Sequence, residues 1–174
     1  MKKLVITFIT LIMLLLTSCK QEQSQNQEQS LNDSKLDSAI FNSKLEKGMS
    51  IAEAKKHQVG EVVTVSGKIL GAYTVFVDGR ASFVMGDPSI LVSCDLKEND
   101  NCKTPWDVCC EKKEIIAANT LSIQVVDEAG KVLKTGLKGK NGLKELSLVT
   151  IKGKIAPQSN DAVTIINAQA IQIN

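Results

Sequence analysis

The chain has 174 residues, which is enough for one domain with additional segments. Its 21 basic and 19 acidic residues give a formal net charge of +2, and only 3% of the residues are aromatic. A nucleic-acid-binding protein needs an excess of positive charge on one face, and often aromatic side chains that stack on bases. The composition therefore argues against nucleic-acid binding.

The N-terminus has the parts of a bacterial lipoprotein signal peptide, residues 1–18. Lys2 and Lys3 form a positive n-region, and residues 4–16 form an apolar run too short to span a bilayer. The run closes on Leu-Thr-Ser-Cys, which resembles the lipobox of bacterial lipoproteins. The resemblance implies cleavage before Cys19, whose acyl chains would then hold the protein on a membrane.

Two alternatives to a lipobox remain at this point: an ordinary secretory signal with an incidental Cys19, and a buried N-terminal helix. Lys20 follows the cysteine, and a residue other than Asp there resembles the outer-membrane sorting pattern of Gram-negative cells. We therefore predict a lipid-anchored domain outside the cytoplasm, in the cell envelope. Removing the signal leaves 19 basic residues against 19 acidic ones, so the mature chain has no net charge and the case for nucleic-acid binding becomes weaker still.

Residues 19–30 comprise the lipidated cysteine and a polar low-complexity tract, which predicts a flexible tether. Residues 31–60 are expected to be a helical segment. Apolar residues at i, i+4 spacing indicate a first amphipathic helix there, and they are Leu36, Ile40, Phe41 and Leu45.

A second short helix is expected at residues 51–58. Ser50 and Glu53 have the spacing of a capping box at its start, and Gly60 would end it. His57, the only histidine, would lie in its last turn, where a cation suits the helix dipole.

From residue 61 the hydrophobic period changes to two, which predicts half-buried strands. The text VTVSGKI at residues 63–69 recurs as VTIKGKI at residues 149–155, and each copy has a central glycine that indicates a bulge or bend. Further strands are predicted at residues 73–77, 81–85, 121–126 and 162–171. A single helical turn is predicted at residues 142–146.

This order of elements resembles the OB-fold, a five-stranded Greek-key barrel with a helix between strands three and four. The resemblance rests on the repeated V-x-V-x-G-x-I text and on the closing segment 166–171. It implies a mainly β protein with an OB-like barrel over residues 61–174, preceded by short helices. The departure from the family pattern is one long loop between strands two and three.

That loop, residues 94–110, is polar and turn-rich and contains all but one of the chain's five cysteines. They are Cys94, Cys102, Cys109 and Cys110. The segment T-P-W-D-x-C-C at residues 104–110 resembles uncharacterised envelope proteins that combine it with an OB-like barrel. The resemblance adds to the fold prediction and implies no activity.

Two disulfides are the first interpretation of these cysteines, because an exported protein meets an oxidising compartment. Neighbouring cysteines rarely bond each other, so Cys109 and Cys110 would each reach back to Cys94 or Cys102. A second interpretation is a thiolate site for zinc or cuprous copper. Its further ligands would come from His57, Asp87, Asp95 or Asp107. The third is a redox-active pair with Lys103 nearby.

The sequence contains no nucleophile elbow, phosphate loop or zinc-protease motif, and with only one histidine it offers no plausible catalytic triad. We therefore predict a non-enzymatic protein without catalytic residues or a cofactor, which presents a cysteine-stapled loop to an envelope protein, a glycan or a small ligand. Its binding face would include Tyr73, Phe76, Arg80, Phe83 and Trp106. The alternatives are barrel core for the two phenylalanines, and metal binding by the cysteines for the protein.

Overall fold

The computed structural model describes Leu36, residues 40–98 and residues 102–174. The predicted signal peptide, Cys19 and the tether lie outside the described residues. Among the described residues, no helix is long and apolar enough to cross a membrane.

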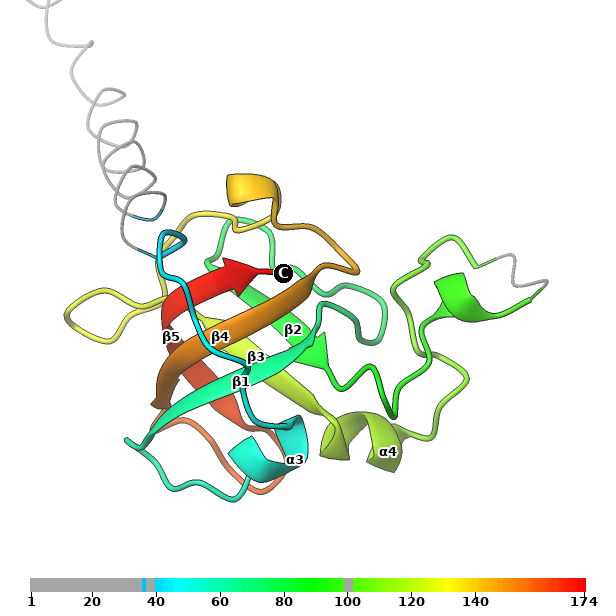
Figure 1. Cartoon of the computed structure of the whole chain (residues 1–174), viewed down its shortest axis with the longest axis horizontal. Coiled ribbons are helices and arrows are strands. Elements are labelled where there is room, and N and C mark those ends of the chain that lie inside the picture. The colour runs from blue at the N-terminus through cyan, green and yellow to red at the C-terminus, as the bar shows by residue number, and fades with distance from the viewer. Residues whose placement is uncertain (1–35, 37–39, 99–101) are drawn as a thin grey trace, which may run out of the picture. The chain divides into compact units, whose positions relative to one another are not determined.

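Five strands form a closed barrel in the order β1-β2-β3-β5-β4 (Figure 1). They are β1 (Val62–Lys68), β2 (Ser82–Gly86), β3 (Thr120–Gln124), β4 (Leu148–Ile155) and β5 (Ile165–Ile173). All neighbouring pairs are antiparallel except β3 and β5, which run parallel. Because β5 lies between β3 and β4, the order is that of the OB-fold. The predicted mainly β, OB-like fold is confirmed.

The two copies of the repeated text become β1 and β4, which pair with each other. A Cβ on Gly153 would lie 2.4 Å from the Asn167 carbonyl oxygen, and one on Gly67 would lie 2.5 Å from Met85 Cε. The register between β4 and β5 shifts at the step before Gly153. The predicted bulge is therefore present at the second glycine, and both positions need glycine because neighbouring atoms occupy the space of a side chain.

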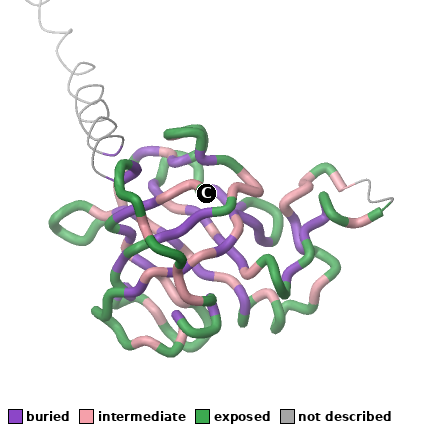
Figure 2. The backbone as a smooth tube through the Cα atoms, in the orientation of Figure 1, coloured by how far each residue is buried: buried purple, intermediate pink, exposed green. Residues whose placement is uncertain are grey.

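Buried residues alternate with more exposed ones along β1 and β3, as expected for strands with one face toward the core, and Figure 2 colours the chain by this burial. The core includes Val63, Val65, Phe76, Phe83, Met85, Leu121, Ile123, Ile151 and Ile171. Phe76 and Phe83 have ring centroids 5.8 Å apart, and their exposed fractions are 4% and 0%. The core alternative is thus confirmed for both phenylalanines.

The strand predicted at residues 73–77 is present only as a bridge between Phe76 and Phe83. Val75 and Val77 still exchange backbone hydrogen bonds with β2. Tyr73, however, has a φ of 55°, which takes the chain out of the extended conformation. The segment before β2 is therefore a short arm along that strand.

The helical segment before the barrel differs from the expectation. Within the first predicted helix, Leu36 is helical and its carbonyl accepts from the Ile40 amide at 3.3 Å, but residues 40–48 are not helical. They bond the barrel instead, since Ile171 donates to the Ile40 carbonyl and Gly48 donates to Ser66 Oγ. Helix α3 (Ile51–Ala54) has the predicted capping box but ends before residue 58.

Two further short elements differ from the predictions. Helix α4 (Lys113–Ala118) precedes β3 and was not predicted, because its N-cap, Lys112, makes no side-chain capping bond. The turn predicted at residues 142–146 lies slightly earlier, as the 3-10 turn η2 (Lys140–Gly142).

Candidate metal centre

The cysteine loop belongs to the connection between β2 and β3, which extends to one side of the barrel and also carries the 3-10 turn η1 (Cys94–Leu96) and α4 (Figure 1). A second, smaller apolar core lies beneath it. Leu70, Leu91 and Val108 are fully buried there, and Ile116 of α4 packs against them. The loop is thus attached to the barrel by its own buried contacts.

Backbone hydrogen bonds bring the two arms of the loop side by side. The Cys94 amide donates to the Asp107 carbonyl, and the Asp95 amide donates to the Pro105 carbonyl, each at 2.9 Å. Cys109 lies two residues beyond Asp107. These bonds therefore place the first cysteine of the loop beside the third.

The T-P-W-D segment, residues 104–107, forms a turn that is hydrogen-bonded to Tyr73, in the chain after β1. We call the contacts of Trp106 and Asp107 with Tyr73 the Tyr73 clamp. The Asp107 amide donates to the Thr104 carbonyl at 2.9 Å, with Pro105 at the second turn position, where its fixed φ is favoured. Trp106 Nε1 donates to the Tyr73 carbonyl at 2.7 Å, and the Tyr73 amide donates to Asp107 Oδ2 at 3.3 Å. Both backbone groups of Tyr73 thus hold the loop.

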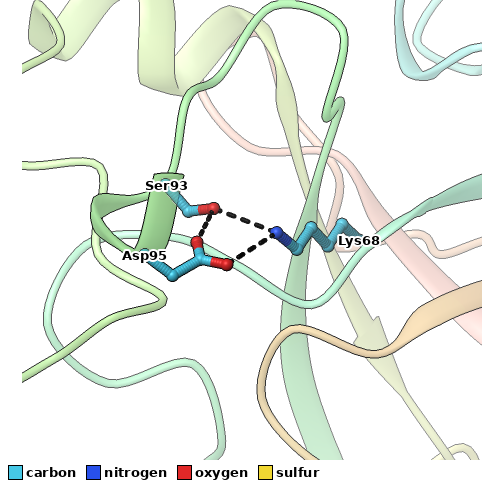
Figure 3. Close-up of polar contacts among 3 residues, drawn as sticks. All are labelled: Lys68, Ser93 and Asp95. Carbon is cyan, nitrogen blue, oxygen red and sulfur yellow. Dashed lines mark hydrogen bonds and ion pairs between the residues drawn. The ribbon is translucent and has the colours of Figure 1, made fainter. Parts of the chain in front are cut away.

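Polar contacts among Lys68, Ser93 and Asp95, which we call the Lys68 strut, connect the Cys94 turn to the end of β1 (Figure 3). Lys68 Nζ donates to Ser93 Oγ at 3.1 Å and lies 3.5 Å from Asp95 Oδ2. Ser93 Oγ in turn donates to Asp95 Oδ1 at 2.5 Å. The two residues that flank Cys94 are therefore both fixed by one lysine of the barrel.

The structure brings three of the predicted cysteines together. The Sγ atoms of Cys94, Cys102 and Cys109 all lie within 4.8 Å of one another. Those of Cys94 and Cys109 are 3.9 Å apart. We call these three side chains the three-sulfur group. Cys110, which is exposed, does not belong to it.

The disulfides expected from the sequence are not formed between the described cysteines. The 3.9 Å between Cys94 and Cys109 is well above the S–S bond length of about 2.05 Å. It is close to the edge of a tetrahedron of sulfurs around zinc, which is about 3.8 Å for Zn–S bonds of about 2.3 Å. The spacing therefore fits a shared cation, which is the second interpretation of the sequence.

The other predicted ligands lie outside the three-sulfur group, and they are His57, Asp87, Asp95 and Asp107. His57 Nδ1 lies 2.8 Å from Glu61 Oε2, so this histidine bonds its own turn. Asp87 Oδ1 accepts from the Ser89 amide at 2.9 Å. Asp95 belongs to the strut with Lys68.

Asp107 is connected to the three-sulfur group through a hydroxyl. Cys102 Sγ lies 3.3 Å from Thr104 Oγ1, which donates to Asp107 Oδ2 at 3.4 Å. The other carboxylate oxygen, Oδ1, is buried and has no hydrogen-bond partner among the residues that the structure describes. Hydrogen-bonding groups placed just beyond the ligands orient the ligands of metal sites. Thr104 and Asp107 are in the position of such groups.

The charges around the group oppose ionisation of its exposed thiol when no cation is present. The hydrogen bond with Cys94 lowers the pKa of Cys109, but burial, contact with Cys110 and the negative charge of Asp107 together raise it above its ordinary value. A cation that binds there must displace a proton from the thiol.

The residues of the predicted binding face differ in exposure. Phe76 and Phe83 are buried, whereas Tyr73 and Arg80 are exposed. Trp106 is half-buried, with Lys138 Nζ 5.9 Å from its ring centroid. The indole N–H of Trp106 bonds the Tyr73 carbonyl and so helps to fix the loop.

Sequence reasoning missed Lys68, Ser93 and Thr104, which contact the cysteines or their neighbours. Only Thr104 gave a local signal, as the first residue of a T-P-x-D turn. The other two are brought together by the fold, from positions far apart in the chain. No protein-family model, curated protein or solved structure matches the chain.

Proposed function

We propose that the protein is a non-enzymatic, lipid-anchored envelope protein that binds one thiophilic metal ion, Zn²⁺ or Cu⁺. Cys94, Cys102 and Cys109 would be the ligands. The observation that carries the proposal is their mutual spacing, with all three sulfurs within 4.8 Å. Thiolate ligands select soft and borderline cations over Mg²⁺ and Ca²⁺, which prefer oxygen.

The three sulfurs suit either ion for different reasons. Three thiolates leave zinc with one of its four tetrahedral positions open, and cuprous copper is favoured by soft sulfur ligands. The buried ligand, Cys94, is held between the two residues of the Lys68 strut. The Lys68 strut and the Tyr73 clamp fix the backbone of the loop before an ion binds. Ion binding should therefore cost little conformational entropy.

The sequence predicted a binding module that presents the loop to a partner. That hypothesis involves the same barrel and loop, but it requires disulfide bonds between the cysteines. The three-sulfur group supports the metal site instead, since its spacing fits a shared cation. The lipid anchor on Cys19 rests on the lipobox resemblance alone. It would hold the metal site at a membrane surface outside the cytoplasm.

The test is the metal content and thiol state of the full mature protein. It would be purified in detergent under anaerobic conditions without a chelator, in the presence of Zn²⁺ or of Cu⁺. We expect one ion per chain and reduced cysteines in the loop. Elemental analysis gives the ion, and intact mass after alkylation of denatured protein gives the number of thiols.

A matched pair of variants locates the site. Cys102→Ser should lose the ion, because it removes one of the three ligands, whereas Cys110→Ser should retain it. A metal-free wild-type protein whose loop cysteines are all in disulfides would contradict the proposal. Equal retention of the ion by both variants would do so as well.

A further inference from the structure

The three-sulfur group has a buried side and an open side. Cys94 is only 4% exposed, Cys102 is half-buried and Cys109 is exposed. An ion bound to all three would therefore be covered on the Cys94 side and reachable from solvent at Cys109. Ions would enter and leave past that sulfur.

A fourth sulfur lies at this opening. Cys110 follows Cys109 in the chain, is exposed and contacts it, yet does not belong to the three-sulfur group. Lys97 reaches Cys110 from the end of η1, the turn that holds Cys94. The opening is thus flanked by a sulfur and an ammonium group from opposite arms of the loop.

Electrostatics at the opening support contact between Cys110 and Lys97. Burial lowers the pKa of Lys97, but its hydrogen bond with Cys110 and the charges of Cys110, Glu111 and Cys94 raise it above its ordinary value on balance. The ammonium group of Lys97 and the sulfur of Cys110 therefore meet between the two arms of the loop.

We propose, building on the metal site above, that Cys110 is the entry sulfur, which takes the ion from an external thiolate carrier and passes it to the three-sulfur group through Cys109. The partner is then a thiol-bearing carrier of Zn²⁺ or Cu⁺. The protein would exchange its ion with that carrier.

Each step is a ligand exchange without oxidation. A bond from the ion to Cys110 forms as a bond to a carrier sulfur breaks, and the carrier thiolate takes up the proton that Cys110 releases. The ion then gains bonds to Cys109, Cys102 and Cys94, each of which releases its proton to solvent. As the bonds to Cys110 and the remaining carrier sulfurs break, these thiolates take up protons from solvent. The same steps in reverse release the ion.

The test compares rates with affinities in the full mature protein. Zinc–glutathione or cuprous glutathione complexes would be mixed with wild-type protein or Cys110→Ser in a stopped-flow instrument. Transfer would be followed by the ultraviolet sulfur-to-metal absorption. We expect transfer to Cys110→Ser to be about tenfold slower in both directions, because attack by a thiolate depends on its access. The Kd should stay within about threefold of wild type, since both rates change together.

Further variants separate this role from a structural one. Lys97→Met keeps the sulfur but removes the ammonium, and should slow transfer less than Cys110→Ser does. Equal transfer rates in wild type and Cys110→Ser would overturn the inference. A large loss of affinity in Cys110→Ser would also overturn it, because Cys110 would then be an equilibrium ligand. Failure of wild-type protein to bind either ion would instead overturn the proposed function.

Discussion

The barrel and the cysteine loop are held together by different kinds of interaction. The barrel has strands that pair along their length around a core of fully buried aliphatic and aromatic side chains. The loop has a buried cluster of only a few apolar residues, and its shape comes from single hydrogen bonds at Tyr73, Ser93 and Asp107. Stability should therefore reside in the barrel, and the geometry of the sulfurs should depend on the loop contacts.

The largest effect should come from emptying the centre of the barrel. Phe83 is fully buried and packs on Phe76, so Phe83→Ala should lower the free energy of unfolding by about 3–5 kcal/mol. Denaturant titration with fluorescence of Trp106 measures this change. Because Phe83 makes none of the loop's hydrogen bonds, the variant that remains folded should bind metal with unchanged Kd. Loss of the ion from folded protein would contradict the separation of the two regions.

A smaller effect is expected from the twin glycines of the repeated text. Gly153→Ala would press on backbone atoms at 2.4 and 2.9 Å and should destabilise the protein by about 1–3 kcal/mol. Gly67→Ala should cost less, because its nearest neighbour is the end of the flexible Met85 side chain and only one backbone atom, the Gly86 oxygen at 2.9 Å, lies closer than 3 Å. Thermal unfolding of both variants checks the order. A reversed order would show that the bulge beside Gly153 relaxes more easily than the straight part of β1.

The barrel could be predicted because each strand has a recognisable pattern within its own short stretch of sequence. Alternation with period two predicted β1 and β3, the repeated text predicted β4, and flanking turn residues and apolar residues predicted β2 and β5. A bulge was expected at both repeated glycines, and the register shift lies beside the second. The misplaced elements are short ones. The strand predicted at residues 73–77 is shortened because Tyr73 has a φ of 55°. Residues 40–48 leave the helical conformation, and Ile40 and Gly48 form hydrogen bonds with the barrel.

The site could be predicted only in composition. Cysteine count and spacing identified which residues would be close, but did not distinguish a disulfide from a metal site, because both need neighbouring sulfurs. The grouping of Cys94, Cys102 and Cys109, with Cys110 outside, depends on which backbone groups of the two arms pair. Lys68 reaches Ser93 only because β1 ends beside the loop, and no spacing in the sequence records that.

The smallest effect on stability, and the most specific one on the site, is expected from Trp106→Phe. The change keeps an aromatic ring and removes the indole N–H that bonds the Tyr73 carbonyl, so the free energy of unfolding should fall by about 1 kcal/mol. Metal affinity should fall about tenfold, as for other groups that orient ligands from outside the coordination sphere.

The control for this variant is Tyr73→Phe. Tyr73 is 79% exposed and holds the loop through its backbone groups, so removing its hydroxyl should leave both stability and Kd unchanged. Calorimetric titration with Zn²⁺ and chemical unfolding of the metal-free proteins give the two quantities separately. If Trp106→Phe lowered stability by several kcal/mol and left Kd unchanged, the Tyr73 clamp would stabilise the fold without positioning the sulfurs. The sulfur spacing would then have to be fixed by the Lys68 strut and the arm-to-arm bonds alone.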